Sequence, residues 1–135
     1  MKILLTLIII ICSNLANASN YTKPYIKMLL LENARNSSYV TPALAMAVAK
    51  VESDFRANVV SKKGAIGVMQ IMPRTALLEF GVKRMDLFNP KININIGIKF
   101  LDKLIKTYKG DIGIALSHYN GGSAVGSSKN PRIIP

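Results

Sequence analysis

Residues 41–53 have the sequence Thr41-Pro-Ala-Leu-Ala-Met-Ala-Val-Ala-Lys-Val-Glu52-Ser53. Thr41 is a good N-cap and Pro42 suits the first position of a helix, so the pattern predicts that a helix begins here. The run that follows is apolar on nearly all faces, which predicts the central buried helix of the domain.

Glu52 lies at the C-terminal end of this predicted helix. Burial disfavours the charged form of a carboxyl group, and the negative end of the helix dipole disfavours it further. A carboxyl group that is still protonated near neutral pH can act as a general acid. The alternative is a surface glutamate paired with Arg56, a contact worth only about 0.2–0.5 kcal/mol.

The rest of the chain predicts a mainly α-helical domain with a small irregular or β-like segment. Apolar residues at helical spacing, with Pro24 in the first turn, predict a helix from Thr22 to about Arg35. Between Asp54 and Pro73 the pattern changes, and Gly64 and Gly67 indicate a loop with short extended pieces.

Three further helices are predicted after this loop. Pro73 opens a short helix that Gly81 ends. Asn89-Pro90 begins the clearest amphipathic helix, which Gly110 stops and whose inward residues are Ile92, Ile96, Phe100, Leu104 and Ile105. Asp111 caps a final helix that leads to His118-Tyr119-Asn120-Gly-Gly122.

The N-terminus predicts export. Lys2 precedes an apolar stretch from Ile3 to Cys12, and Ala16-Asn17-Ala18 is a small-x-small cleavage site. The stretch is shorter than the about 20 residues that span a bilayer, so we interpret residues 1–18 as a signal peptide cut after Ala18, with an uncleaved anchor as the alternative. Residues 19–135 then form one domain, periplasmic or secreted, with no stable membrane anchor after cleavage.

The inventory of side chains limits the chemistry. Cleavage removes Cys12, the only cysteine, and leaves His118 as the only histidine. This argues against a zinc site or a Ser-His-Asp triad, and no metal or cofactor is expected. The chain has 18 basic and 7 acidic residues and a net charge of +11. Because it is predicted to be exported and has no aromatic-rich RNA-binding motif, the charge favours an anionic cell wall over nucleic acid, with a plain solvated surface as the alternative.

Three polar groups lie where predicted elements end: Glu52-Ser53, Gly67-Val-Met69-Gln70 and Tyr119-Asn120-Gly-Gly122. Amides supply paired donors and acceptors, and glycines let the backbone approach a ligand. Met69 and Tyr119 offer apolar surfaces for a sugar ring, so the groups suit an uncharged ligand rich in hydroxyl and acetamido groups. Singly, each has a simpler interpretation: a solvated loop residue for Gln70, a core residue for Met69, and a helix end with its turn for Tyr119-Asn120.

Together these groups resemble the soluble lytic transglycosylase family of lysozyme-like domains, from about Ala43 to Gly122. The motifs are Ala-Val-Ala-Lys-Val-Glu52-Ser53-Asp-Phe, Gly64-Ala-Ile-Gly67-Val-Met69-Gln70-Ile-Met-Pro73-Arg-Thr-Ala and Ala115-Leu-Ser-His-Tyr119-Asn120-Gly-Gly. Asn89-Pro-Lys-Ile-Asn-Ile-Asn-Ile-Gly97-Ile-Lys-Phe-Leu101 matches the helix between the second and third motifs.

The resemblance implies a lysozyme-like α+β fold, mainly α, and cleavage of peptidoglycan strands between N-acetylmuramic acid and N-acetylglucosamine. Glu52 would be the single catalytic acid and base, leaving a 1,6-anhydro-muramic end. Met69 and Gln70 would line the sugar subsites, and Tyr119 and Asn120 would position substrate. Ser53, counted with the substrate-binding residues, would support the site from the helix end, unless it is a simple helix-end hydroxyl.

The sequence departs from the family in one respect. The family usually continues into a helix with a Thr-x-x-Tyr-Val element, and the sequence stops at Pro135 before one, so the domain is expected to be truncated at its C-terminus. A non-catalytic peptidoglycan-binding or secretion-assembly protein, a lysozyme-type hydrolase and a cationic membrane-active protein therefore stay open as alternatives. The short length and the signal peptide resemble small transglycosylases that accompany envelope-spanning secretion systems, which adds such an assembly as a partner.

Overall fold

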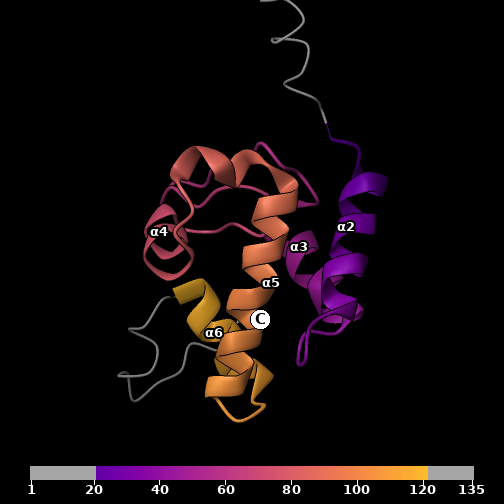
Figure 1. The fold of residues 1–135 in the computed structure, drawn as a ribbon, viewed down its shortest axis with the longest axis vertical. Helices are drawn as coiled ribbons and strands as arrows, with labels where there is room; N and C mark the ends of the chain where they lie inside the picture. The colour runs from indigo at the N-terminus through magenta and orange to yellow at the C-terminus, as the bar shows by residue number, and fades with distance from the viewer. Residues whose placement is uncertain (1–20, 122–135) are drawn as a thin grey trace, which may run out of the picture.

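The computed structural model describes residues 21–121, so the predicted signal peptide, Gly122 and the last residues of the chain lie outside it. The described chain forms a mainly α-helical fold, as predicted (Figure 1). Its elements are α2 (Lys23–Arg35), α3 (Pro42–Ser53), α4 (Pro73–Phe80), the 3-10 helix η1 (Arg84–Phe88), α5 (Pro90–Thr107) and α6 (Ile112–Gly121).

The helix starts are the ones that the capping residues predict. The side chains of Thr22, Thr41, Asn89 and Asp111 each accept a hydrogen bond from a main-chain N–H two or three residues later. Each of these bonds satisfies an N–H group that a helix leaves without a partner in its first turn. A proline follows within two residues of the first three caps, where its missing N–H costs nothing.

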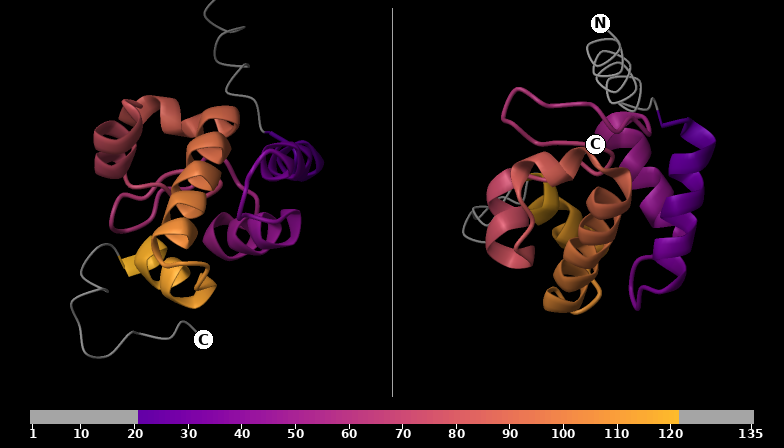
Figure 2. Two further views of the ribbon diagram at one scale, coloured as in Figure 1. Left: turned by 60° about the horizontal axis from the view of Figure 1, so that its bottom comes forward. Right: turned by 45° about the horizontal axis from the view of Figure 1, so that its top comes forward.

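The central helix is α5. It lies between α2 and α3 on one side and α4 and α6 on the other in both views of Figure 2 and in Figure 1. Nine of its 18 residues are buried, among them Ile94, Ile98 and Leu101 outside the predicted stripe. Of the predicted inward residues, Ile92 and Phe100 are only partly buried. Because other elements cover α5 on several sides, its buried surface is wider than a single amphipathic stripe.

The prediction that α3 is the central buried helix is wrong. Its buried residues are Ala45, Val48, Ala49 and Ser53, whereas Val51 is 78% exposed. Helix α3 packs chiefly against α2. An apolar composition permits burial on any face, but only a neighbouring element can provide it, and the described chain covers α3 on one side.

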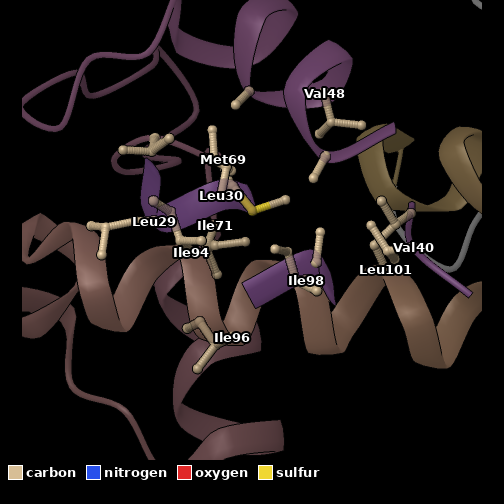
Figure 3. Close-up of a cluster of buried hydrophobic side chains, with 14 of the residues drawn as sticks. Leu29, Leu30, Val40, Val48, Met69, Ile71, Ile94, Ile96, Ile98 and Leu101 are labelled. Atoms are coloured by element: carbon tan, nitrogen blue, oxygen red, sulfur yellow. The ribbon is translucent and has the colours of Figure 1, made fainter. Parts of the chain in front are cut away.

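The loop between α3 and α4 has the short extended pieces that its glycines predict. Two isolated antiparallel bridges pair Ile66 with Val60 and with Ile71. The loop carries Met69 into the main core, where Figure 3 shows it beside Leu30, Ile94 and Ile98. The loop is therefore anchored by its own side chains to α2 and α5.

Candidate active site

Helix α3 ends in a left-handed turn directly after Glu52 and Ser53. Asp54 and Phe55 have φ of 51° and 60°, and their N–H groups bond back to main-chain carbonyls of α3. Such a conformation is unusual for phenylalanine. The Phe55 side chain is 7% exposed and the Lys27 ammonium lies 4.8 Å from its ring centroid, so tertiary contacts hold this turn.

The Ser53 hydroxyl joins the end of α3 to the following loop. It donates a 2.7 Å hydrogen bond to the Val68 carbonyl and accepts one of 3.1 Å from the Arg56 N–H. The residue is 2% exposed. In this structure the Ser53 hydroxyl therefore links the helix end to the loop, and its place among the substrate-binding residues stays a prediction.

Asn93 of α5 anchors the loop between α3 and α4 through its side chain, and none of the sequence motifs singles this residue out. Its side chain is fully buried, accepts a hydrogen bond of 2.9 Å from the Met69 N–H, and donates to the carbonyls of Ile66 (2.8 Å) and Leu87 (2.9 Å). Gly67 has φ of 81°, and a Cβ there would lie 2.3 Å from Asn93 Nδ2. Only glycine fits this position, so the loop can approach α5 closely.

The Met69 side chain lies in the hydrophobic core. It is fully buried and packs against Gly97 of α5, where a Cβ would lie 2.6 Å from the Met69 sulfur. This burial favours the interpretation of Met69 as a core residue, and its place in a sugar subsite stays a prediction. A flexible methionine side chain fills such a gap well.

Gln70 follows in a left-handed conformation, with φ of 51°. Its Nε2 donates to the carbonyls of Val59 (3.1 Å) and Gly67 (3.0 Å). The side chain is half-buried, so its amide nitrogen shapes the loop while part of its surface faces solvent. Its place in a sugar subsite stays a prediction.

Tyr119 of α6 reaches the same loop. Its hydroxyl donates a 2.7 Å hydrogen bond to the Met69 carbonyl, and its ring lies 5.6 Å from that of Phe100. Burial raises the pKa of Tyr119 well above its usual value, and the charge of Glu52 raises it further. Glu52 and Tyr119 therefore lie close enough to interact electrostatically, and all three predicted groups meet.

The two neighbours of Tyr119 on α6 differ in environment. Asn120 is exposed, which leaves its side chain accessible to a ligand, and its role in substrate binding stays a prediction. His118 packs against its neighbours: its Nδ1 lies 2.7 Å from the Tyr108 hydroxyl and its ring meets Phe100 edge-on.

Glu52 itself is partly buried, and this burial raises the pKa of its carboxyl group. The alternative of a pair with Arg56 is wrong, because Arg56 Nε donates instead to the Ser53 carbonyl at 2.9 Å. Among residues 21–121 the ion pairs are Lys23–Asp54, Lys50–Asp54 and Lys103–Glu79, so Glu52 has none there.

The carboxyl group of Asp54, two residues after Glu52, has a pKa that is shifted in the opposite direction. Its hydrogen bonds with the ammonium groups of Lys23 and Lys50 lower the pKa of Asp54 to about 2. Two carboxyl groups whose environments shift their pKa values apart are typical of sites where one of them exchanges protons. Here the environment favours protonation of Glu52.

The described part of the chain shows neither a metal-binding cluster nor a membrane span. Among residues 21–121 no three His, Asp or Glu side chains come together in a group that could hold a metal ion. None of the helices in the same range is both long and apolar enough to cross a bilayer.

Comparison with known proteins gives one family. A family model described as "Transglycosylase SLT domain" matches residues 30–130. Membrane-bound lytic murein transglycosylase C from Yersinia pestis and from Yersinia pseudotuberculosis is 35% identical over 99 residues, which cover 62% of this chain. The chain thus spans 28% of the length of these curated relatives.

Solved structures share the fold. An inactive glutamate-to-glutamine mutant of lytic transglycosylase Slt from Pseudomonas aeruginosa matches with a TM-score of 0.65 and 25% identity, over 78% of this chain and 19% of that one. The 70 kDa soluble lytic transglycosylase from Escherichia coli matches with a TM-score of 0.63 and 31% identity, over 71% of this chain and 16% of that one. A complex of the 70 kDa soluble lytic transglycosylase with bulgecin A matches with the same values.

Proposed function

Because the chain belongs to the transglycosylase SLT domain family, we propose that it is a peptidoglycan lytic transglycosylase in which Glu52 is the single general acid and base. The observation that carries this proposal is the state of the Glu52 carboxyl group. It is partly buried, has a raised pKa and lies within electrostatic reach of Tyr119. The inactive Pseudomonas aeruginosa mutant, with glutamine in place of a glutamate, also supports a glutamate as the catalytic group.

The proposed reaction needs one carboxyl group and no water. Protonated Glu52 donates its proton to the glycosidic oxygen between N-acetylmuramic acid and N-acetylglucosamine, and the bond from that oxygen to the anomeric carbon breaks. The C6 hydroxyl of the same muramic acid attacks the anomeric carbon, and the Glu52 carboxylate takes the hydroxyl proton. The products are a 1,6-anhydro-muramic end and a free 4-hydroxyl on N-acetylglucosamine, and Glu52 is protonated again.

The neighbouring carboxyl group supports this single-carboxylate chemistry. Most glycosidases use a second carboxylate as a nucleophile or to activate water. Asp54 is the nearest candidate in the sequence, and both of its carboxylate oxygens are bonded to lysine ammonium groups. An internal hydroxyl nucleophile removes the need for a second carboxylate.

The proposed location is the cell envelope. The relatives named above act on murein by name and are called membrane-bound, and the net charge of +11 suits an anionic wall. The proposal includes export by the predicted signal peptide, with a secretion-system assembly as an additional partner. In the candidate site, Gln70 and Asn120 would supply amide contacts to the glycan.

Digestion of purified peptidoglycan, followed by mass spectrometry of the soluble products, tests the proposal. Anhydro-muramic ends, one water lighter than hydrolysed ends, are expected. Reducing muramic ends would identify a lysozyme-type hydrolase instead. Binding to the wall without release of soluble fragments at any pH near neutrality would indicate a non-catalytic wall-binding protein.

The Glu52→Gln variant assigns the acid. It keeps the size of the side chain and removes the exchangeable proton, so product release should fall below detection. Asp54→Asn is the matched control, because it removes the carboxylate two residues further along the chain. If Glu52→Gln retained activity, or if Asp54→Asn lost as much, Glu52 would not be the single acid and base.

A further inference from the structure

The outer side of α4 and η1 carries a concentration of exposed apolar side chains. Leu78 and Met85 are each 70% exposed, Leu77 is 56% exposed and Met72 is 41% exposed. We call these four residues the α4–η1 patch. Large exposed apolar patches on a globular domain mark surfaces that contact a partner or a membrane.

The leucines of this patch are not needed to hold α4 in place. Ala76 is buried and Phe80, one turn later, meets Phe100 of α5 edge-on at 6.5 Å, so these two residues mark the inward face of α4. At about 100° per residue, Leu78 points directly away from that face and Leu77 lies at its side. Arg74, one turn before Leu78, shares their side of the helix.

Cations surround the exposed leucines. A groove with a cavity volume of about 470 Å³ lies between α4 and the start of η1, and its described lining contains three cations and no acid: Pro73, Arg74, Leu77, Leu78, Lys83 and Arg84. Nη1 of Arg84 lies 4.0 Å from the Met85 sulfur, so its charge stays beside the apolar tips.

The acids near the patch do not cancel these charges. Glu79 of α4 is bonded to Lys103 at 2.6 Å, which compensates its charge. Asp86 is exposed next to Met85 and is the remaining acid among residues 72–88. Apolar tips ringed by cations are the combination that binds at a bilayer surface, where apolar side chains enter the boundary of headgroups and acyl chains and cations meet lipid phosphates.

We propose that the α4–η1 patch binds the surface of a bilayer that contains anionic phospholipid. Leu77, Leu78 and Met85 enter between the headgroups, and Arg74, Lys83 and Arg84 contact the phosphates. A second copy of the chain is the poorer occupant, because it would oppose the same cations to one another in a protein of net charge +11. The patch shares no residue with the candidate active site, so this proposal is independent of the proposed function.

Co-sedimentation with vesicles tests the proposal, using the chain without the predicted signal peptide. We expect binding to vesicles of equal parts phosphatidylcholine and phosphatidylglycerol, weak binding to phosphatidylcholine alone, and a loss of affinity as salt rises. Leu77→Ser with Leu78→Ser should weaken binding to the anionic vesicles about tenfold or more. Lys83→Gln with Arg84→Gln should weaken it by a similar factor and flatten the dependence on salt.

Matched controls lie elsewhere on the surface. Ile112→Ser removes an apolar side chain that is 45% exposed on α6, and Lys62→Gln with Lys63→Gln removes two exposed cations from the loop. Both should bind vesicles as the parent does, with thermal melting to verify folding. Absence of binding to anionic vesicles, or equal losses in patch and control variants, would overturn the proposal. The proposal would also be overturned if the patch variants kept vesicle binding but lost self-association or binding to an acidic peptide, because the patch would then contact a protein.

Discussion

The Tyr119 hydroxyl donates a 2.7 Å hydrogen bond to the main-chain carbonyl of Met69, which lies 50 residues earlier in the chain. Through this bond α6 holds the loop that Ser53 ties to the end of α3. The Met69 side chain is meanwhile fixed against Gly97 of α5. The loop that follows Glu52 is therefore held by α3, α5 and α6. Met69 supplies two of these contacts, its carbonyl to Tyr119 of α6 and its side chain to Gly97 of α5.

Tyr119→Phe should weaken both stability and turnover. The variant removes the donor and leaves the Met69 carbonyl without it, which costs about 1–3 kcal/mol of unfolding free energy. Because Tyr119 acts here through the loop, we expect kcat to fall about 10- to 100-fold while KM changes little. Denaturant unfolding and peptidoglycan turnover measure the two effects.

Tyr108→Phe is the control for Tyr119→Phe. It removes a hydroxyl with a bond of equal length, to Nδ1 of His118, the residue directly before Tyr119 on α6. It should lose some stability and retain turnover. Equal loss of turnover in both variants would show that Tyr119 affects the reaction only through the stability of α6.

Asn93→Ala should be the most destabilising single change that we propose. It leaves the Met69 N–H and the Ile66 and Leu87 carbonyls without their buried partner, and each orphaned group costs about 1–3 kcal/mol. We expect the free energy of unfolding to fall by about 3 kcal/mol or more, measured by denaturant titration.

Asn95→Ala gives the matched comparison for Asn93→Ala. Asn95 lies two residues further along α5, is only partly buried, and donates to Asn33 at 3.2 Å. Its replacement should cost about 1 kcal/mol or less. Similar losses in the two variants would contradict the role of Asn93 as the anchor of the loop.

The sequence predicts most of the secondary structure because its signals are local. Thr41 and Asn89 cap helices through side-chain bonds to their own first turns, so no tertiary information is needed. The segments of the candidate site also lie where short motifs end, and Ser53 and Tyr119 both bond to the main chain of the loop between α3 and α4. The family resemblance adds the order of these motifs, which composition and periodicity alone do not provide.

Burial is the property that the sequence predicts poorly. The run from Ala43 to Val51 looks like a core helix, but only a neighbouring element can cover it. Met69 looks like a ligand surface, but Gly97, 28 residues later, leaves the space that its side chain fills. Asn93 falls within alternating isoleucines and asparagines, and the signal that would have identified it is a polar side chain on the buried face of α5.

Asp54→Asn distinguishes the role of the Asp54 carboxyl group from that of Glu52, two residues earlier. The pKa of Asp54 is about 2 in the folded protein, below its ordinary 3.8, so this group stabilises the fold above the ordinary value and the effect is lost as pH falls toward 2. Asparagine tolerates the left-handed turn. The variant should therefore show a small loss of stability at neutral pH that disappears in acid, with unchanged peptidoglycan turnover. An equal loss of stability at pH 2 and pH 7 would contradict the role of the lysine pairs.

Glu52→Gln should stabilise the protein while it removes activity. Burial raises the pKa of Glu52 above its ordinary 4.5. Between pH 4.5 and this raised pKa, the folded state therefore holds more protons than the unfolded state. The free energy of unfolding of the parent then falls as pH rises through that window. Glutamine has no charge to desolvate, so the stability advantage of the variant should be smallest below pH 4.5 and grow as pH increases.

Denaturant unfolding across this pH range measures the stability advantage of Glu52→Gln, with Glu32→Gln on the exposed side of α2 as the control. Parallel curves for parent and Glu52→Gln would show that burial does not act on this carboxyl group. A variant that is more stable and inactive would show that the lost activity is not a loss of folding. Such a result would also fit the common finding that a functional group lowers the stability of the fold.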